Sequence, residues 1–331
     1  MIKYIKDKLQ VHNLGYFISN YFSFSLQVLL GFLIFAIIYY RKGADELGIF
    51  IQSYTFFVLL GQLSVIGINE SVLQKISSQK KEKNIFINAF ISVIFFLILF
   101  CVIIYNFFPL IVGFFKSDEL LYSNSYLYLA IFFFGLNKLA FSYFIANKKL
   151  NYFAFLNFLR PFNLSLLIIF CIFYIEAIDY SLLFLLAEIF LFINSYLIII
   201  KIEKLNKLKI SFSNIINHYK FGLKVFINSF LNESFIRIDI LIVGLLLSDR
   251  EVGIYGLAAL FLEGVYQFAI VIRNIVNPEI GYLYSTKNYR DIVKLSKKYS
   301  LICLLVIVSI SSLVILSFDY LLIFVDQYEL S

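Results

Sequence analysis

The chain has 331 residues, of which 61% are hydrophobic and only 15% are charged. Soluble domains contain roughly 45–50% apolar residues, so this composition excludes a soluble protein and indicates an integral membrane protein. The net charge is +7, but no basic face with base-reading elements accompanies it, which excludes nucleic-acid binding.

Apolar runs follow one another from the N-terminus onward. A helix that crosses a bilayer needs about 20 apolar residues, and these runs are continuous rather than alternating, so we expect helices. We predict an all-α integral membrane protein with about nine transmembrane helices, at residues 14–39, 47–68, 86–113, 121–146, 153–175, 181–200, 221–247, 253–273 and 299–317. Residues 1–205 are expected to form a six-helix bundle, and residues 206–331 the first half of a second bundle.

Charge differs between the two sides of the predicted membrane. The N-terminus and the loops after the even-numbered spans hold 19 of the 28 Lys and Arg residues, whereas the opposite loops hold four. The positive-inside rule therefore places the N-terminus in the cytoplasm. On that side, residues 289–300 (YRDIVKLSKKYS) alternate apolar and basic positions. This pattern predicts a helix on the membrane surface or a solvated helical linker.

One short stretch of the sequence occurs twice. ADELGIFIQSYTFFVL (44–59) aligns at an offset of 205 with DREVGIYGLAALFLEG (249–264). At this offset Gly48 matches Gly253, and Gln62 matches Gln267. Both copies leave the predicted external side and enter a span that runs inward, so a parallel repeat of two bundles is expected. Chance matching between Phe- and Ile-rich helices is the alternative.

The second copy lies within RIDILIVGLLLSDREVGIYGLAALFLEGVYQF (237–268), which resembles the start of the second half of Wzx-like flippases. These translocate lipid-linked oligosaccharides and belong to a superfamily that also contains MATE drug exporters and the lipid II flippase. ADELGIFIQSY and GINESVLQKIS in the first half, and NPEIGYLYSTKNYRDIVKLSKKYS near the end, are similar to the same family. The family typically has twelve or more spans, so we expect a truncated product, a reduced form or an oligomer.

Charged side chains inside a bilayer are functional candidates, because each costs at least about 2.5–3.5 kcal/mol on insertion scales. Span 7 carries Asn232, Glu233, Arg237 and Asp239. Glu233 and Arg237 are four residues apart and share one helical face, whereas Asp239 points elsewhere. We predict that this face lines a hydrophilic cavity in which Arg237 binds an anionic headgroup. A structural ion pair is the alternative.

Further polar residues fall in other spans. Lys138 is either a second cation in the cavity or extends to the cytoplasmic side. Glu263 and Gln267, one turn apart, are placed at the bundle interface, where interhelical packing explains them equally well. Glu188 is either a proton-linked carboxylate or the partner of a residue on a neighbouring helix, and Arg160 is placed nearer a membrane interface.

Catalytic chemistry finds no support in the sequence. The two histidines, His12 and His218, lie in juxtamembrane segments, and the three cysteines fall inside predicted spans. Zinc spacing, a phosphate-cradling glycine loop and a nucleophile elbow are absent from the sequence. We therefore predict no catalytic residue, no metal and no cofactor, and a protein that is not an enzyme.

The resemblance implies a flippase that moves undecaprenyl-pyrophosphate-linked oligosaccharide across the bacterial inner membrane for O-antigen or capsule biosynthesis. It also implies membrane lipids and a polysaccharide polymerase as partners. The cavity would offer cations to the pyrophosphate, and amides and hydroxyl groups to the sugars. A MATE-like exporter of drugs or metabolites is the alternative within the superfamily. A membrane polysaccharide polymerase or glycosyltransferase is the alternative outside it, but the external loops are short for such enzymes.

Overall fold

The computed structural model describes residues 2–78, 82–117, 119–175, 177–202, 210–235, 237–260, 276, 280, 283 and 288–326. Within these ranges the chain is helical and forms no strand, which confirms the predicted all-α class. The chain divides into two compact units. One comprises Phe22–Leu257, and the other comprises Met1–Tyr21 with Ala258–Ser331.

The named helices account for most of the described chain. They are α1 (Ile2–Leu63), α2 (Ile68–Ser78), α3 (Glu82–Val112), the short 3₁₀ helix η1 (Tyr122–Asn124), α4 (Leu127–Ala146), α5 (Leu150–Tyr174), α6 (Tyr180–Ile202), α7 (Phe212–Ser234), α8 (Ile238–Leu246) and α10 (Tyr289–Asp326). Residues 249–260 are also helical. In the described part, five segments are long and apolar enough to cross a membrane: Ser25–Leu63, Asn84–Val112, Tyr122–Ala146, Leu150–Tyr174 and Tyr180–Ile202.

Predicted spans 1 and 2 both lie in α1, and Gly43 separates them. Its φ of 91° and ψ of −178° are not helical. An L-residue with a side chain rarely adopts this conformation, whereas glycine does so without steric cost. The chain therefore turns within the predicted external loop, and residues 44–63 form a second helical segment. We call this part of α1 segment 44–63.

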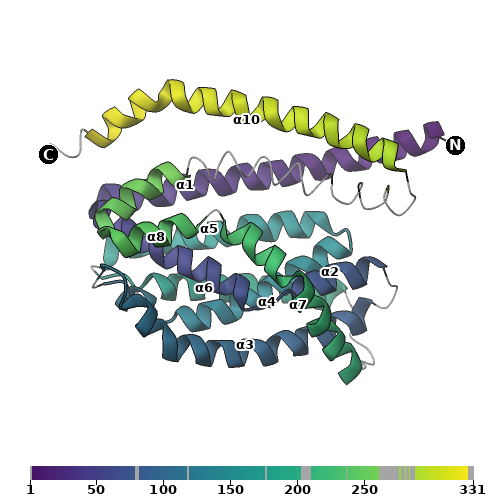
Figure 1. Cartoon of the computed structure of the whole chain (residues 1–331), viewed down its shortest axis with the longest axis horizontal. Coiled ribbons are helices and arrows are strands. Elements are labelled where there is room, and N and C mark those ends of the chain that lie inside the picture. Colours follow the sequence, from purple (N-terminus) through teal and green to yellow (C-terminus); the bar gives the residue numbers. More distant parts are fainter. Residues whose placement is uncertain are drawn as a thin grey trace. The chain divides into compact units, whose positions relative to one another are not determined.

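Segment 44–63 and the helices that follow it build the core of the first half of the chain. Helix α4 packs against α2, α3 and α6, and α5 packs against α6 (Figure 1). Aromatic rings fill the interface, because the Phe57 ring of segment 44–63 lies 5.2 Å from Phe134 of α4 and 4.9 Å from Phe184 of α6. One face of segment 44–63 is thereby fixed to α4 and α6.

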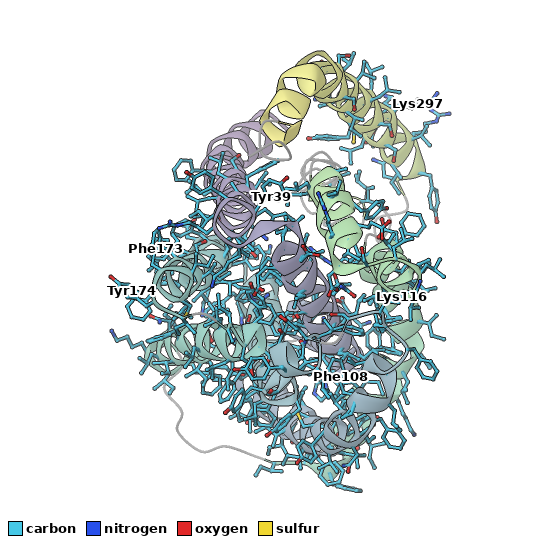
Figure 2. All side chains as sticks on the ribbon, turned by 90° about the vertical axis from the view of Figure 1, so that its left-hand side faces the viewer. Tyr39, Phe108, Lys116, Phe173, Tyr174 and Lys297 are labelled. Atoms are coloured by element: carbon cyan, nitrogen blue, oxygen red, sulfur yellow. The ribbon has the colours of Figure 1, made fainter. Side chains whose placement is uncertain are left out.

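The outer surface of this unit is apolar, as expected for a protein that faces lipid. Phe173 and Tyr174 project outward from the end of α5, where they are 53% and 76% exposed, whereas Phe108 lies inside (Figure 2). Soluble monomers rarely expose apolar patches larger than a few hundred Å², so this surface is suited to a bilayer.

The predicted span 221–247 is not one helix. Helix α7 begins earlier, at Phe212, and ends at Ser234, and α8 begins at Ile238. The prediction was wrong because apolar content does not reveal an interruption between two helices. The four-residue relation between Glu233 and Arg237 therefore does not apply across this break. Helix α7 itself packs against α2 and α3 (Figure 1).

In the other unit, α10 runs from Tyr289 to Asp326 as one helix. It contains both the basic stretch at residues 289–300 and predicted span 9. The basic stretch therefore continues the span instead of forming a separate surface helix. The centre of the predicted linker between the bundles, residues 203–209, lies outside the described residues.

Candidate substrate site at the seam between the two halves

Segment 44–63 contacts the second half of the chain through a pair of glycines. A Cβ atom added at Gly48 would overlap the carbonyl oxygen of Asp249, and one added at Gly253 would overlap the carbonyl oxygen of Ala44. The offset of 205 relates residue 44 to residue 249 and residue 48 to residue 253. Exchanging the two copies of the repeat therefore converts the first contact into the second. A parallel repeat with both copies packed together predicts this geometry. We call this surface the seam.

Polar side chains flank the glycine contact. Gln52 donates from Nε2 to Oδ1 of Asp249 at 2.6 Å. Ser248 donates from its backbone N–H and its hydroxyl to Oε2 of Glu251, and the backbone bond is one of the two bonds of a capping box, at the start of the helix at residue 249. In the first copy the matching acid, Glu46, instead accepts a 2.7 Å bond from the hydroxyl of Tyr180. The two copies of the turn are thus related in backbone but not in hydrogen bonding.

Asp249 is an acid held in a partly buried position. Burial raises the pKa of this carboxyl above its ordinary value, and the neighbouring acids Asp45 and Glu119 raise it further, while the bond from Gln52 opposes them. The predicted external end of the seam therefore gathers several acidic side chains, and Asp249 takes up a proton more readily than an exposed aspartate does.

A cation lies at the seam where the helix breaks. Arg237 occupies the position before α8, and its guanidinium carbon lies 4.9 Å from the ring centre of Tyr54 in segment 44–63. Asp239, in the first turn of α8, accepts a 2.6 Å bond from the hydroxyl of Tyr255 and a 2.9 Å bond from the N–H of Ile240. Arg237 and Asp239 thus flank the first residue of α8, and the carboxylate accepts its bonds from Tyr255 and Ile240.

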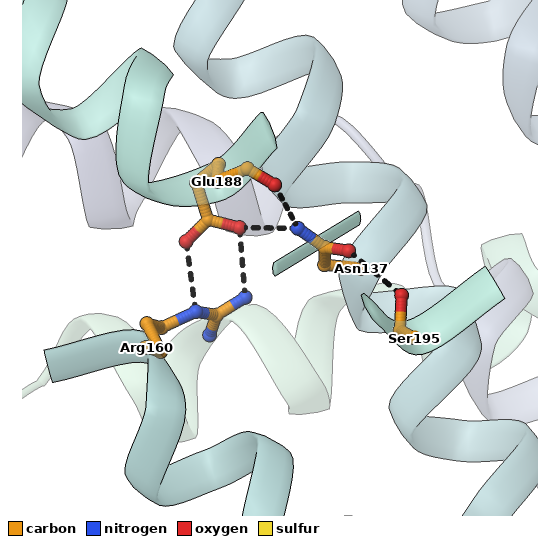
Figure 3. Close-up of polar contacts among 4 residues, drawn as sticks. All are labelled: Asn137, Arg160, Glu188 and Ser195. Carbon is orange, nitrogen blue, oxygen red and sulfur yellow. Dashed lines mark hydrogen bonds and ion pairs between the residues drawn. The ribbon is translucent and has the colours of Figure 1, made fainter. Parts of the chain in front are cut away.

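Glu188 lies away from the seam, inside the first half. Its carboxylate forms an ion pair with Arg160, 2.8 Å from Nε to Oε1, and accepts a 2.7 Å bond from Asn137 (Figure 3). Ser195 in turn donates to Asn137 at 3.2 Å. Of the two interpretations of Glu188, the structure shows the partner on a neighbouring helix. The guanidinium of Arg160, which was predicted to lie nearer a membrane interface, packs between the rings of Phe134 and Phe141.

The structure describes only some of the remaining predicted site residues. Lys138 is half-buried on α4, next to Asn137, in the first half of the chain. The side chains of Asn232 and Glu233 lie outside the described part of the chain, as do Glu263 and Gln267. Of the predicted site residues, the structure therefore brings Arg237 to the seam, whereas Asp239 is bonded to residues of its own half.

A second contact between the halves forms at the predicted cytoplasmic end. Gly67, with φ of 75°, packs against the backbone of Gly222 in α7. His218 of α7 is buried, and its Nδ1 lies 2.9 Å from the hydroxyl of Ser71 in α2. Burial, and then the nearby Lys75 cation, lower the pKa of His218 to about 4. The imidazole is therefore neutral at physiological pH.

Sequence reasoning missed several members of these groups. Tyr54, Asn137 and Ser71 are common residue types in apolar helices, and nothing in their spacing marks them. Gln52 carried a usable signal, because it follows Gly48 by one helical turn within the repeated stretch. In the residues that the structure describes, no group of three His, Cys, Asp or Glu side chains is placed to hold a metal ion.

Solved structures share this fold. The MATE multidrug transporter DinF-BH, solved as a complex, matches with a TM-score of 0.67 and 17% identity, over 88% of this chain and 70% of that one. A MOP superfamily transporter from Pyrococcus furiosus matches with a TM-score of 0.65 and 12% identity, over 91% and 71%. An outward-facing MATE transporter of the same superfamily matches with a TM-score of 0.64 and 14% identity, over 90% and 70%. At these identities the likeness shows the fold alone.

The sequence itself matches a family model. Residues 43–318 match the model described as polysaccharide biosynthesis protein. None of the curated proteins matches the sequence significantly. Because the family match covers most of the chain, the chain belongs to the polysaccharide biosynthesis protein family, and its fold is similar to that of the MATE and MOP transporters.

Proposed function

We propose that this multi-pass membrane protein moves undecaprenyl-pyrophosphate-linked oligosaccharide across the bacterial inner membrane, with its N-terminus in the cytoplasm. The family assigns the chain to polysaccharide biosynthesis, and the fold is that of transporters. Arg237 is the observation that carries the substrate class. Its guanidinium lies between the two halves, at a break between helices, against Tyr54.

A guanidinium at this place suits a pyrophosphate. Arginine keeps its proton under all physiological conditions, and its planar fork forms paired hydrogen bonds with phosphate oxygens. Discontinuous helices in transporters often carry substrate-binding groups at their broken ends. Arg237 would bind the pyrophosphate, while the sugars pass along the seam and the lipid tail stays in the bilayer. The proposal contains no covalent step, so we infer that the protein is not an enzyme, and a polysaccharide polymerase would use its product.

Export of drugs is the rival function within the superfamily, since one of the similar structures is a multidrug transporter. A permanent cation at the seam repels organic cations, which disfavours cationic drugs as substrates of this chain. Protection of cells against such compounds by this protein would therefore favour the rival.

Complementation of a flippase-deleted strain with the matching glycan tests the proposal. We expect the wild type to restore surface glycan, and Arg237→Ala to lose it by about 10- to 100-fold, because charge-assisted bonds contribute about 1.5–3 kcal/mol each. Arg237→Lys keeps the charge without the fork and should fall between the two. Surface glycan is compared at equal membrane abundance of each variant.

Arg41→Ala is the matched control. It also removes a guanidinium that packs on an aromatic ring, 4.3 Å from Phe173, but at an exposed position on the first half. It should restore glycan fully. Equal loss in both variants would show that the Arg237 result reflects packing, and failure of the wild type would contradict the proposed substrate.

A further inference from the structure

Segment 44–63 carries buried polar atoms that have no hydrogen-bond partner. They are the carbonyl oxygen Oε1 of Gln52, the hydroxyl of Thr55 and the carbonyl oxygen Oε1 of Gln62. Gln52 and Thr55 are completely buried. Buried polar atoms are nearly always paired, so three on one helical segment require an explanation. Other atoms of this kind occur in the described chain, but no other helix there carries three.

All three residues lie on one side of segment 44–63, the side that contacts the second half at Gly48 and Gln52. In a helix with 3.6 residues per turn, positions 52, 55 and 62 lie on the same face of the helix as position 48. That side contacts the second half, because Gly48 packs on Asp249 and the side chain of Gln52 packs on Gly244. The opposite side carries Phe57, which packs on α4 and α6.

Polar groups on that opposite side do have partners. The hydroxyl of Ser53 accepts a 2.8 Å bond from Asn124. Ser64, just after the segment, donates to the carbonyl of Gly61 at 2.7 Å. The side of the segment that is fixed to its own bundle is therefore satisfied, whereas the seam side keeps unused hydrogen-bonding capacity.

The unpaired atoms lie on the same helical segment as Tyr54, the residue that Arg237 contacts. Thr55 follows Tyr54, against which Arg237 packs, and Gln62 lies about 10 Å further along the helix axis. The buried Ser234 hydroxyl, beside the helix break, also lacks a partner. The sequence repeat places a second glutamine, Gln267, at the position that matches Gln62.

We propose that Gln52, Thr55 and Gln62 form a sugar-binding face that hydrogen-bonds the hydroxyl groups of the transported glycan when the seam opens. This inference rests on the proposed function and assigns the residues that recognise the sugar. Sugar hydroxyl groups both donate and accept hydrogen bonds. They would donate to the amide oxygens of Gln52 and Gln62 and would pair with the hydroxyl group of Thr55. The pyrophosphate binds Arg237, and the sugars extend along segment 44–63.

Ligand-induced stabilisation of the purified full-length chain tests the sugar-binding face. The probes are undecaprenyl pyrophosphate alone and the undecaprenyl-pyrophosphate-linked oligosaccharide extracted from the producing cells. We expect both to raise the unfolding temperature of the wild type, and the glycan-bearing probe to bind more tightly. Thr55→Val and Gln62→Met should weaken glycan binding about three- to tenfold each, the range expected for one hydrogen bond, and leave binding of the sugar-free probe unchanged.

Two further variants separate recognition from packing. Thr55→Ser keeps the hydroxyl and should keep glycan affinity. Ser53→Ala, on the opposite side of the same segment, should lower the unfolding temperature without ligand, because Asn124 loses a partner, and should keep glycan affinity. Thr55→Val should show the reverse, with unchanged or higher stability and weaker glycan binding.

Each other outcome contradicts a specific statement. If the sugar-free probe stabilises the wild type and the glycan adds nothing, the sugar-binding face is wrong while the proposed function stands. If Thr55→Val destabilises the protein as Ser53→Ala does, the hydroxyl has a structural partner such as water, and the face is wrong. If neither probe stabilises the wild type, the proposed function is overturned, and the face with it.

Discussion

Arg160 and Glu188 place a complete ion pair inside the first half of the chain. The carboxylate is satisfied by Arg160 and Asn137 together, and the guanidinium packs on two aromatic rings. A buried pair of this kind adds little net stability, but removing one member leaves a buried charge without compensation. Glu188 is therefore a structural residue in this arrangement, and a proton-transfer role would require that pair to separate.

Substitution of Glu188 tests whether this residue has the structural role. We expect Glu188→Ala to lower the free energy of unfolding by about 1–3 kcal/mol, because the partly buried Arg160 and the buried Asn137 both lose a hydrogen-bond partner. The double substitution Arg160→Met with Glu188→Met should recover most of that loss. Chemical unfolding in mild detergent measures both effects.

Transport per molecule separates the structural role from a coupling role. If Glu188 carries protons, Glu188→Gln abolishes transport at normal abundance, which would contradict the structural role. We expect lower abundance with transport per molecule retained. Asn194→Ala serves as the control on the same helix, because that side chain donates to the Phe190 carbonyl of its own helix and should leave both quantities unchanged.

At the scale of helices, the seam depends on two backbones that approach each other without side chains between them. Gly48 and Gly253 provide this, one in each half. Small residues permit such close packing between membrane helices. A methyl group at either position meets a backbone carbonyl, which cannot move aside as a flexible side chain would.

We expect Gly48→Ala and Gly253→Ala each to cost about 1–3 kcal/mol of stability, the range for overpacking a close contact. The double variant should cost less than the sum, because one displacement of the helices relieves both overlaps. Unfolding temperatures in detergent measure these costs.

Gly113→Ala is the control for the glycine substitutions. A Cβ at Gly113 meets only ordinary contacts, 3.5 Å and 3.6 Å from two carbonyl oxygens, so stability should hardly change. Additive costs at Gly48 and Gly253 would show that the two positions do not share one seam.

For the whole molecule, the described contacts between the halves lie near both ends of segment 44–63. Gly48 and the end of α1 at Leu63 are about 22 Å apart along the helix, and Gly67 lies beyond that end. Arg237 and the sugar-binding face lie between these contacts. A transporter that alternates access must open each contact in turn, so their strength sets the balance between its states.

The contact at His218 makes stability depend on pH. The folded pKa of about 4 lies below the ordinary value of 6.5, so the unfolded chain binds more protons between these values. Stability from this group is complete above about pH 6.5 and is lost as the pH falls toward 4, by about 3 kcal/mol at most. Unfolding temperature measured from pH 4 to 8 shows this loss.

His218→Gln is the matching variant, because glutamine donates and accepts hydrogen bonds but does not titrate. The difference between the wild-type and variant curves isolates His218 from the carboxylates that titrate in the same range. If unfolding temperature varies with pH in the same way in both proteins, His218 is not a buried neutral histidine at this contact.

The sequence by itself determined the all-α membrane class of the protein and its family. Both follow from properties that are local or additive: apolar content along the chain, and motifs that lie within short stretches of it. The repeat also aligned Gly48 with Gly253, but the alignment did not show that the two backbones touch.

Only the tertiary structure decided which polar residues meet. Glu188 and Arg160 are 28 positions apart, and Tyr54 and Arg237 lie in different halves, so their pairing depends on how helices pack. The break between α7 and α8 was hidden because the chain remains apolar across it. Spacing along one helix predicts neighbours within that helix, whereas contacts between helices depend on rotation and register, which the pattern of one helix does not contain.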